Sequence, residues 1–259
     1  MKNITKIALV SCVAGLMSAG VALAETVKVS WAAEPYPPFA SPDSSGSWSG
    51  WEVEFAAAVC KEAKLDCEIT PVAWDGIIPA LTSKKIDMII SSMTVTDERL
   101  KTIDFSDKYY DARAAIAGPK GTAFDATPEG LSGKVLGVQT SSIHQRYAEK
   151  HFGASVSEIK EYQTLDEAQQ DLAAGRIDAI QGDSFALNSF LKSTTGECCD
   201  LKGYVEKDEA ILGHGIGIGL RKGDTALKEQ LNAAIKAIRA DGTYATITKK
   251  YFDFDIYGE

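Results

Sequence analysis

The sequence has no excess of positive charge, and after its first 24 residues it has no long hydrophobic run. Its 27 lysines and arginines face 36 aspartates and glutamates, which gives a formal net charge of −9. A chain this acidic repels the phosphates of nucleic acids, so we expect no nucleic-acid partner. No segment beyond residue 24 is apolar enough to span a bilayer, so no membrane helix is expected there.

Histidine is scarce as well. The three histidines, His144, His151 and His214, are not spaced as metal ligands are, so we predict neither a metal site nor a cofactor. The glycine-spaced segment GHGIGIGL lacks both the G-x-G-x-x-G spacing and the following helix that a dinucleotide site requires. We interpret it as a buried strand.

The first 24 residues have the pattern of a secretory signal peptide. The basic start MKNITK is followed by an apolar run that ends with small residues at Ala22–Ala24. The mature protein is therefore expected to begin near Glu25 and to be periplasmic. Loss of two lysines would change its formal charge from −9 to −11. A lipoprotein that begins at Cys12 is the alternative, but the apolar run continues well past that residue.

Four cysteines remain in the mature chain. Cys60 and Cys67 flank KEAKLD, and the oxidising compartment favours a local disulfide between them; two buried thiols are the alternative. Cys198 and Cys199 are adjacent in a polar loop. They either form a vicinal bridge or stay reduced, and their spacing does not decide between the two.

Two segments of the chain repeat one pattern. LTSKKIDMII from Leu81 and LAAGRIDAIQ from Leu172 both read as a helix end, a basic turn and a short buried strand. Each half also opens with an apolar strand, TVKVSWA in one and KVLGVQT in the other. Strands that alternate with helices predict an α/β fold with mostly parallel sheets, whose ligands lie beyond the carboxyl ends of the strands. Helices are expected at Trp51–Ala63, Asp75–Thr82, Asp97–Thr102, Leu165–Ala174 and Thr225–Ala240, with a short terminal helix in ATITKKYF.

Polar residues gather where the first repeated strand ends. Ser91, Ser92 and Thr94 offer hydroxyl groups, and Arg99 offers a guanidinium whose planar fork suits a carboxylate. A cation in the first turn of a helix opposes the helix dipole, which suggests that the arginine serves a ligand. The alternative is a solvated helix start in which Arg99 pairs with neighbouring acids.

The second repeated strand ends at Asp183. Its carboxylate suits an ammonium group, and the alternative is a cap on the following helix. Tyr36 and Trp74 are the aromatic candidates for a ligand side chain, although either suits a hydrophobic core equally well. Together with Arg99 these residues match a zwitterion, with its carboxylate on the arginine and its ammonium on the aspartate.

Several longer motifs resemble one protein family. AEPYPPF, WDGIIPAL, KKIDMIISSMTVTDERLKTIDFSDKYY, GKVLGVQTSS, GRIDAIQGD and IRADGTYATITKKYFDFDIYGE are similar to periplasmic solute-binding proteins of polar amino-acid ABC transporters, across the mature chain. The likeness is strongest to lysine/arginine/ornithine- and histidine-binding proteins, with opine-binding proteins as neighbours. It implies a two-lobed type II periplasmic-binding-protein fold with two hinge strands that closes on its ligand. The implied boundaries are 25–111 and 213–259 for lobe 1 and 112–212 for lobe 2.

The resemblance also implies a role for each site residue. The ligand carboxylate is assigned to Arg99, Ser92 and the amides of Ser142 and Ile143. The α-ammonium is assigned to Asp183, Ser91 and Thr94. Tyr36 and Trp74 would flank the side chain. Because Arg99 and Asp183 belong to different lobes, we expect the two lobes to have no charged link without the ligand.

Three positions depart from the pattern of the basic-amino-acid binders. The acidic residue expected three positions before Tyr36 is Ala33 here. Glu34, two positions before, is the candidate that would replace it if Pro35 shifts the loop, and the sequence does not decide whether it does. Gln139 stands where an apolar residue is usual. Ile143 replaces a threonine, which leaves only its backbone for the carboxylate.

The sequence thus predicts a binding protein that captures a basic amino acid (arginine, ornithine, lysine or histidine) and delivers it to an ABC importer. The alternatives are an opine or another conjugate as ligand, or an enzyme similar to cyclohexadienyl dehydratases that uses Glu34, His144 and Asp183 as acids and bases. We expect no catalysis, because no nucleophile–base pair is evident. The expected partners are the membrane permease subunits, with a chemoreceptor as a further candidate, and the protein is expected to be a monomer.

Overall fold

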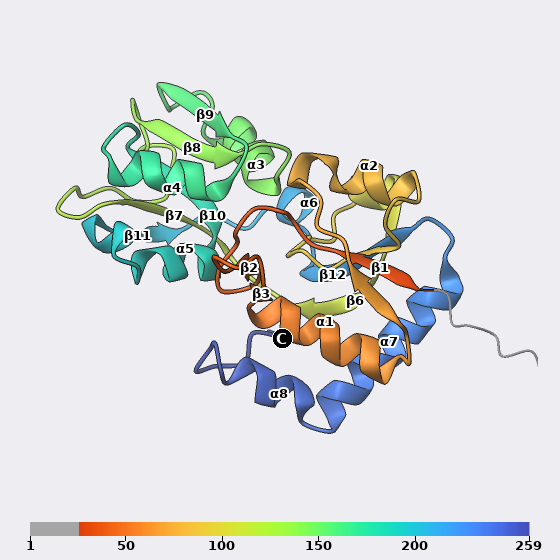
Figure 1. The fold of residues 1–259 in the computed structure, drawn as a ribbon. Coiled ribbons are helices and arrows are strands. Elements are labelled where there is room, and N and C mark those ends of the chain that lie inside the picture. The colour runs from red at the N-terminus through yellow and green to blue at the C-terminus, as the bar shows by residue number, and fades with distance from the viewer. Residues whose placement is uncertain (1–25, 259) are drawn as a thin grey trace, which may run out of the picture.

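Two five-stranded sheets, each covered by helices on both faces, form the two lobes of the protein (Figure 1). The structure is a computed structural model that describes residues 26–258, so the expected signal peptide lies outside the described residues. In lobe 1 the strand order is β4 (Cys67–Ile69), β1 (Val27–Ser30), β5 (Met88–Ile89), β12 (Ile216–Arg221) and β6 (Ile103–Tyr110). In lobe 2 it is β11 (Cys199–Tyr204), β7 (Ala114–Pro119), β10 (Ala179–Asp183), β8 (Val135–Gln139) and β9 (Glu158–Tyr162).

The two sheets share one topology. In each, four strands run in the same direction and one, β12 in lobe 1 or β7 in lobe 2, runs against them. The chain passes between the sheets twice, from β6 to β7 and from β11 to β12. This arrangement confirms the predicted α/β fold of two mostly parallel sheets, and the glycine-spaced segment is the strand β12 that returns to lobe 1.

The repeated Ile-Asp pattern has the same structural role in both lobes. Asp87 precedes β5, and its carboxylate accepts a hydrogen bond of 2.9 Å from the amide of Lys28 on β1. Asp178 precedes β10, and its carboxylate accepts one of 2.8 Å from the amide of Val135 on β8. The aspartate therefore joins the start of one strand to its parallel neighbour, so the likeness of the two segments reflects equivalent positions in the two sheets.

The central strands are apolar because both of their faces are covered. Successive residues of β5, Met88 and Ile89, belong to hydrophobic clusters on opposite sides of the lobe 1 sheet, and so do Ala179 and Ile180 of β10 in lobe 2. The helices of lobe 1 are α1 (Trp51–Glu62), α2 (Ile77–Thr82), α7 (Thr225–Ala240) and α8 (Thr243–Thr248). Those of lobe 2 are α3 (Ile143–His151), α4 (Leu165–Ala173) and α5 (Ser184–Leu191), with α6 (Glu209–Leu212) on the connection back to lobe 1.

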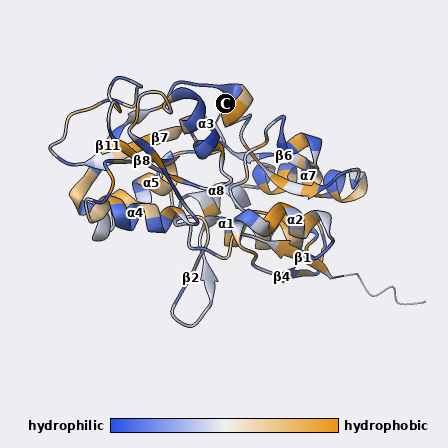
Figure 2. Cartoon of the chain, turned by 90° about the horizontal axis from the view of Figure 1, so that it is seen from above, coloured by the Kyte–Doolittle hydropathy of each residue, from blue (hydrophilic) through white to orange (hydrophobic). Residues whose placement is uncertain are grey.

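Figure 2 shows a hairpin that projects from the body of the molecule, formed by β2 (Ser41–Pro42) and β3 (Trp48–Ser49). Within residues 26–258 no helix combines the length and the hydrophobicity needed to cross a membrane.

The predicted helices are found with one exception. The segment Asp97–Thr102 is not an α-helix but a single 3₁₀ turn, Arg99–Lys101, and β6 begins two residues later. The hydroxyl of Thr96 accepts a hydrogen bond from the amide of Arg99, as an N-cap residue does, but the chain enters the sheet before a full helical turn can follow. The expected helix at Asp75–Thr82 is divided into a 3₁₀ turn (Trp74–Gly76) and α2.

Cys60, near the end of α1, and Cys67, at the start of β4, form the predicted disulfide. Cys198 and Cys199 are both free, the first exposed and the second buried, so this pair is reduced in the structure. Burial raises the pKa of the Cys199 thiol to about 12.

We expect the double variant Cys60→Ala/Cys67→Ala to lose about 2 kcal/mol of unfolding free energy, because the disulfide closes a short loop in the unfolded chain. Urea denaturation of the ligand-free protein measures this. Reduction of the wild-type protein should give a similar loss, and Cys198→Ser, which breaks no bond to another cysteine, should give none. An unchanged urea midpoint in the double variant would contradict the prediction.

Candidate functional site

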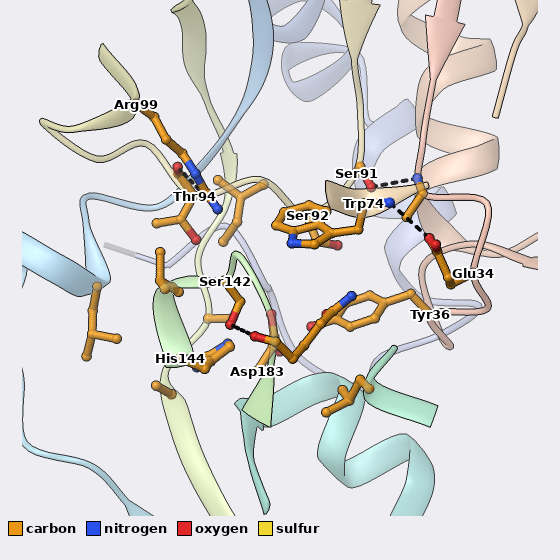
Figure 3. Close-up of a pocket in the computed structure, with 18 of the residues that line it drawn as sticks. Glu34, Tyr36, Trp74, Ser91, Ser92, Thr94, Arg99, Ser142, His144 and Asp183 are labelled. Carbon is orange, nitrogen blue, oxygen red and sulfur yellow. Dashed lines mark hydrogen bonds between the residues drawn. The ribbon is translucent and has the colours of Figure 1, made fainter. Parts of the chain in front are cut away.

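A cavity with about 740 Å³ of free volume, including its open mouth, lies between the two lobes (Figure 3). All eleven predicted ligand residues line it: Glu34, Tyr36, Trp74, Ser91, Ser92, Thr94, Arg99, Gln139, Ser142, Ile143 and Asp183. Their roles in binding stay predictions. The sequence did not assign eight further lining residues to the binding site: Ala32, Pro35, Ala112, Ala114, His144, Leu165, Leu212 and Ile216. Seven of these eight have no polar side chain, so the sequence gives no indication that they line a binding site.

Ser91, Ser92 and Thr94, here called the hydroxyl cluster, follow the carboxyl end of β5, as expected for a ligand site of a parallel sheet. The hydroxyl of Ser91 accepts a hydrogen bond of 2.9 Å from the amide of Ala32, which ties the segment to the end of β1. Ser92 has a φ of 49°, in the left-handed region that non-glycine residues seldom occupy. Its amide donates a 2.6 Å hydrogen bond to Glu52 of α1. These bonds hold the turn in the wall of the cavity.

Arg99 is 8% exposed, and its guanidinium is held from two sides. It donates a hydrogen bond of 3.0 Å to the carbonyl of Thr94 and lies 5.4 Å from the ring centre of Trp74. Burial, and secondarily the charge of Arg146, lower its pKa to about 10. No described carboxylate lies within ion-pair distance of it; the alternative in which it pairs with neighbouring acids is therefore wrong. A buried guanidinium without a counterion suits an anionic ligand group.

Asp183 faces the cavity from the end of β10 and is 7% exposed. Its carboxylate accepts a hydrogen bond of 2.7 Å from the amide of Phe185, so it also caps α5, as the alternative interpretation proposed. Burial raises its pKa to about 7. No lysine, arginine or histidine among the described residues lies within ion-pair distance of Asp183, so its carboxyl lacks the cation that would favour the charged form.

Glu34, rather than Ala33, lines the cavity. One carboxylate oxygen of Glu34 accepts a 3.3 Å hydrogen bond from the amide of Trp74, which fixes the acid beside the aromatic residue (Figure 3). Ala33 is exposed and lies outside the lining. Tyr36 lines the same region, and burial raises its pKa well above the ordinary value, so its hydroxyl stays protonated.

The lobe 2 wall is formed by the end of β8 and the start of α3. Ser142 caps α3: its hydroxyl donates to the carbonyl of Gln139 over 2.6 Å and accepts from the amide of Gln145 over 3.1 Å. His144 follows in the first turn. Burial and the nearby Arg99 lower its pKa to about 4, so the imidazole is neutral, and its buried Nδ1 has no partner among the described groups.

An ion pair connects the lobes outside the cavity, which corrects the expectation of no charged link without ligand. Arg146 of α3 lies 2.6 Å from Glu98, the residue before Arg99. Aromatic contacts also cross between the lobes. Phe185 of α5 packs with its ring centre 5.3 Å from that of Phe252 and 6.5 Å from that of Phe39.

The cavity therefore offers one cation, Arg99, and two carboxylates, Asp183 and Glu34, with aromatic rings between them. Within residues 26–258 no group of three or more histidine, cysteine, aspartate or glutamate side chains is arranged to hold a metal ion. The arrangement is suited to noncovalent binding of a small molecule that carries both an anionic and a cationic group.

Comparison with known proteins gives the same picture. The L-arginine-binding protein of Pseudomonas aeruginosa is 41% identical over 224 residues, which cover 86% of each chain. The histidine-binding periplasmic protein of Escherichia coli (strain K12) is 37% identical over 259 residues, 99% of each chain. The solved structure of an ancestral arginine-binding protein bound to arginine superposes with a TM-score of 0.81 at 35% identity and covers 88% of this chain and 98% of the other.

These relatives are binding proteins. The family model for bacterial extracellular solute-binding proteins, family 3, matches residues 29–254, nearly the whole described chain. The chain belongs to this family.

Proposed function

We propose that the protein binds a basic L-amino acid in the cavity between its lobes and delivers it to a membrane ABC importer. One observation carries the proposal: Arg99 of lobe 1 and Asp183 of lobe 2 are buried around one cavity, and neither has an oppositely charged partner among the described residues. A zwitterion supplies both missing charges. The named specificities of the relatives, arginine and histidine, support a basic side chain.

In the proposed complex the ligand carboxylate lies on the guanidinium of Arg99, with the hydroxyl of Ser92 and the amides of Ser142 and Ile143 nearby. The α-ammonium lies on Asp183, with Ser91 and Thr94. The side chain passes between Tyr36 and Trp74 towards Glu34, whose carboxylate receives the distal cation. Glu34 thereby takes the place of the acid that is missing at Ala33.

A thermal-shift screen of protein stripped of bound ligand by unfolding and refolding tests the ligand class. Saturating arginine, lysine, ornithine or histidine should raise the melting temperature by about 5–10 °C, since a ligand at 100 times its Kd adds about 2.7 kcal/mol. Glutamate and aspartate should change it little, because their second carboxylate would meet Glu34 and Asp183. A shift with acidic amino acids, and none with basic ones, would overturn the assignment.

A conjugate of a basic amino acid, such as an opine, is the second candidate. Three residues of the lining carry hydrogen-bonding groups that the α-amino-acid contacts do not use: the side-chain amide of Gln139, and the buried ring nitrogens Nδ1 of His144 and Nε1 of Trp74, which have no partner among the described groups. The same screen with opines added separates the two candidates.

We further propose that the protein is not an enzyme. Burial lowers the pKa of His144, the candidate base, to about 4, which makes it a weak base, and it has no acidic partner to orient it among the described residues. Incubation with prephenate or arogenate is therefore expected to yield no aromatic product. We also propose that the signal peptide of residues 1–24 is cleaved and that the lobes divide at 111/112 and 212/213. We propose a monomer whose partners are the permease subunits, with a chemoreceptor as a further candidate.

A further inference from the structure

A further carboxylate, that of Glu52 on α1, lies outside the lining of the cavity. Glu52 is 1% exposed, although glutamate is seldom fully buried without a partner. One of its oxygens accepts hydrogen bonds from the amide of Ser92 and from the hydroxyl of Tyr109, and the other accepts a 3.2 Å hydrogen bond from the Ser92 hydroxyl. Among the described residues no lysine, arginine or histidine lies within ion-pair distance of it.

The bonds of Glu52 converge on the one residue of the hydroxyl cluster that has an unfavourable backbone. The φ of 49° at Ser92 is stabilised by a carboxylate that binds both its amide and its side chain. Ser92 in turn lines the cavity. Glu52 therefore determines where the Ser92 hydroxyl and the turn that follows β5 stand, without reaching the ligand itself.

Four titratable groups, three phenols and one carboxylate, interact electrostatically with Glu52. They are Tyr109 and Tyr110 of β6, Tyr36 of the loop after β1, and Asp183 at the end of β10. Burial, with a smaller contribution from Asp183, raises the pKa of Glu52 to about 7, and the hydrogen bonds from Tyr109 and Ser92 oppose this. None of these four groups carries a positive charge, so a cation that enters the cavity would add a stabilisation of the Glu52 carboxylate that its hydrogen bonds alone do not supply.

We propose that Glu52 is a positioning residue of the ligand site that fixes Ser92 and whose negative charge is stabilised by the ammonium group of the bound ligand. This inference rests on the proposed function. A ligand cation favours the ionised forms of Asp183 and Glu52, so both lose protons on binding. With pKa values of about 7 in the empty protein, both carboxyls are partly protonated near pH 7, so binding should release up to about one proton in total, part of it from Glu52.

The test is isothermal titration calorimetry of stripped protein with L-arginine, in phosphate and in Tris at pH 7, which counts released protons. In Glu52→Gln the amide oxygen can still accept from the Ser92 amide and the Tyr109 hydroxyl, and the amide nitrogen can donate to the Ser92 hydroxyl, but the charge is gone. We expect Glu52→Gln to release measurably fewer protons than the wild type, because only Asp183 is then left to lose one. The affinity of this variant should match that of the wild type at pH 5.5 and be about tenfold lower at pH 8, if the pKa of Glu52 falls by about one unit on binding.

Two further variants complete the design. Glu54→Gln, two residues along α1, removes a carboxylate that pairs with Lys250 on the outside of lobe 1, and its affinity relative to wild type should not vary with pH. Tyr109→Phe removes a hydrogen bond that holds the pKa of Glu52 down, so the rise of affinity with pH should shift to higher pH. This variant tests the proposal independently if Glu52→Gln does not fold.

The outcomes separate the two proposals. One outcome against the inference is that wild-type protein binds L-arginine with no release of protons. The other is that Glu52→Gln releases as many protons as wild type, with a ratio of the two affinities that is constant from pH 5.5 to 8. In either case Glu52 is not coupled to the ligand, while the proposed function stands. If wild-type protein binds none of L-arginine, L-lysine and L-histidine, the proposed function is wrong and this inference falls with it.

Discussion

Arg99→Ala is expected to weaken binding of a basic amino acid by roughly 30- to 5,000-fold. Truncation of one member of a buried charge pair costs about 2–5 kcal/mol, much of it from leaving the other charge unpaired. Arg99 is 8% exposed and has no acidic partner within the described part of the chain, so the ligand carboxylate would lose its only cation in the cavity. Calorimetry on stripped protein measures the loss.

Arg99→Lys should lose a large part of the same affinity, because an ammonium cannot reproduce the two parallel hydrogen bonds of a guanidinium. Arg146→Ala is the matched control. This variant removes an arginine from the same region. The ion pair of Arg146 with Glu98 is partly exposed, and such pairs contribute about 1 kcal/mol or less to stability. Near-native affinity of Arg99→Ala, or an equal loss in Arg146→Ala, would remove Arg99 from the carboxylate site.

The fold was predictable from the sequence where local patterns and tertiary structure agree. The Ile-Asp repeat marks equivalent strands, and the apolar runs after it are strands buried on both faces. The prediction was wrong at Asp97–Thr102, where a capping threonine followed by two acids is also the signature of a helix start. Tertiary structure decided that segment, because β6 begins at Ile103 and leaves space for one 3₁₀ turn.

The polar part of the site was predictable for a different reason. Hydroxyl and charged residues directly after buried strands stand out, and the topology places strand ends together. Ala112 and Leu212 come from the connections between the lobes and Ile216 is the first residue of β12, and none of the three has a polar side chain that would indicate a ligand contact. Glu52 was missed because it follows Trp51 at the start of α1, where an acid is favoured by the helix dipole in any case. Its burial follows only from the packing of α1 against β6 and the hydroxyl cluster.

Asp183→Asn is expected to have opposite effects on binding and on stability. Binding of a basic amino acid should weaken by roughly 30- to 5,000-fold, because the α-ammonium would lose its buried counterion. The fold should be retained, because asparagine also caps helices and can accept the hydrogen bond of the Phe185 amide.

The stability of the empty protein should instead increase in Asp183→Asn, and the increase should depend on pH. Burial raises the pKa of Asp183 from 3.8 to about 7 in the folded protein, so ionisation is easier in the unfolded chain. Below about pH 4 such a carboxyl has no effect on the free energy of unfolding. Above that pH it destabilises the folded state increasingly up to pH 7, at a cost on the order of 4 kcal/mol once it is fully ionised.

Urea denaturation of stripped protein at pH 5 and pH 8 should therefore show a larger gain in unfolding free energy for the variant at pH 8. A saturating basic amino acid should make the wild type the more stable of the two proteins. Equal stability of variant and wild type at pH 8, with affinity unchanged, would mean that Asp183 is not the buried counterion of the ligand.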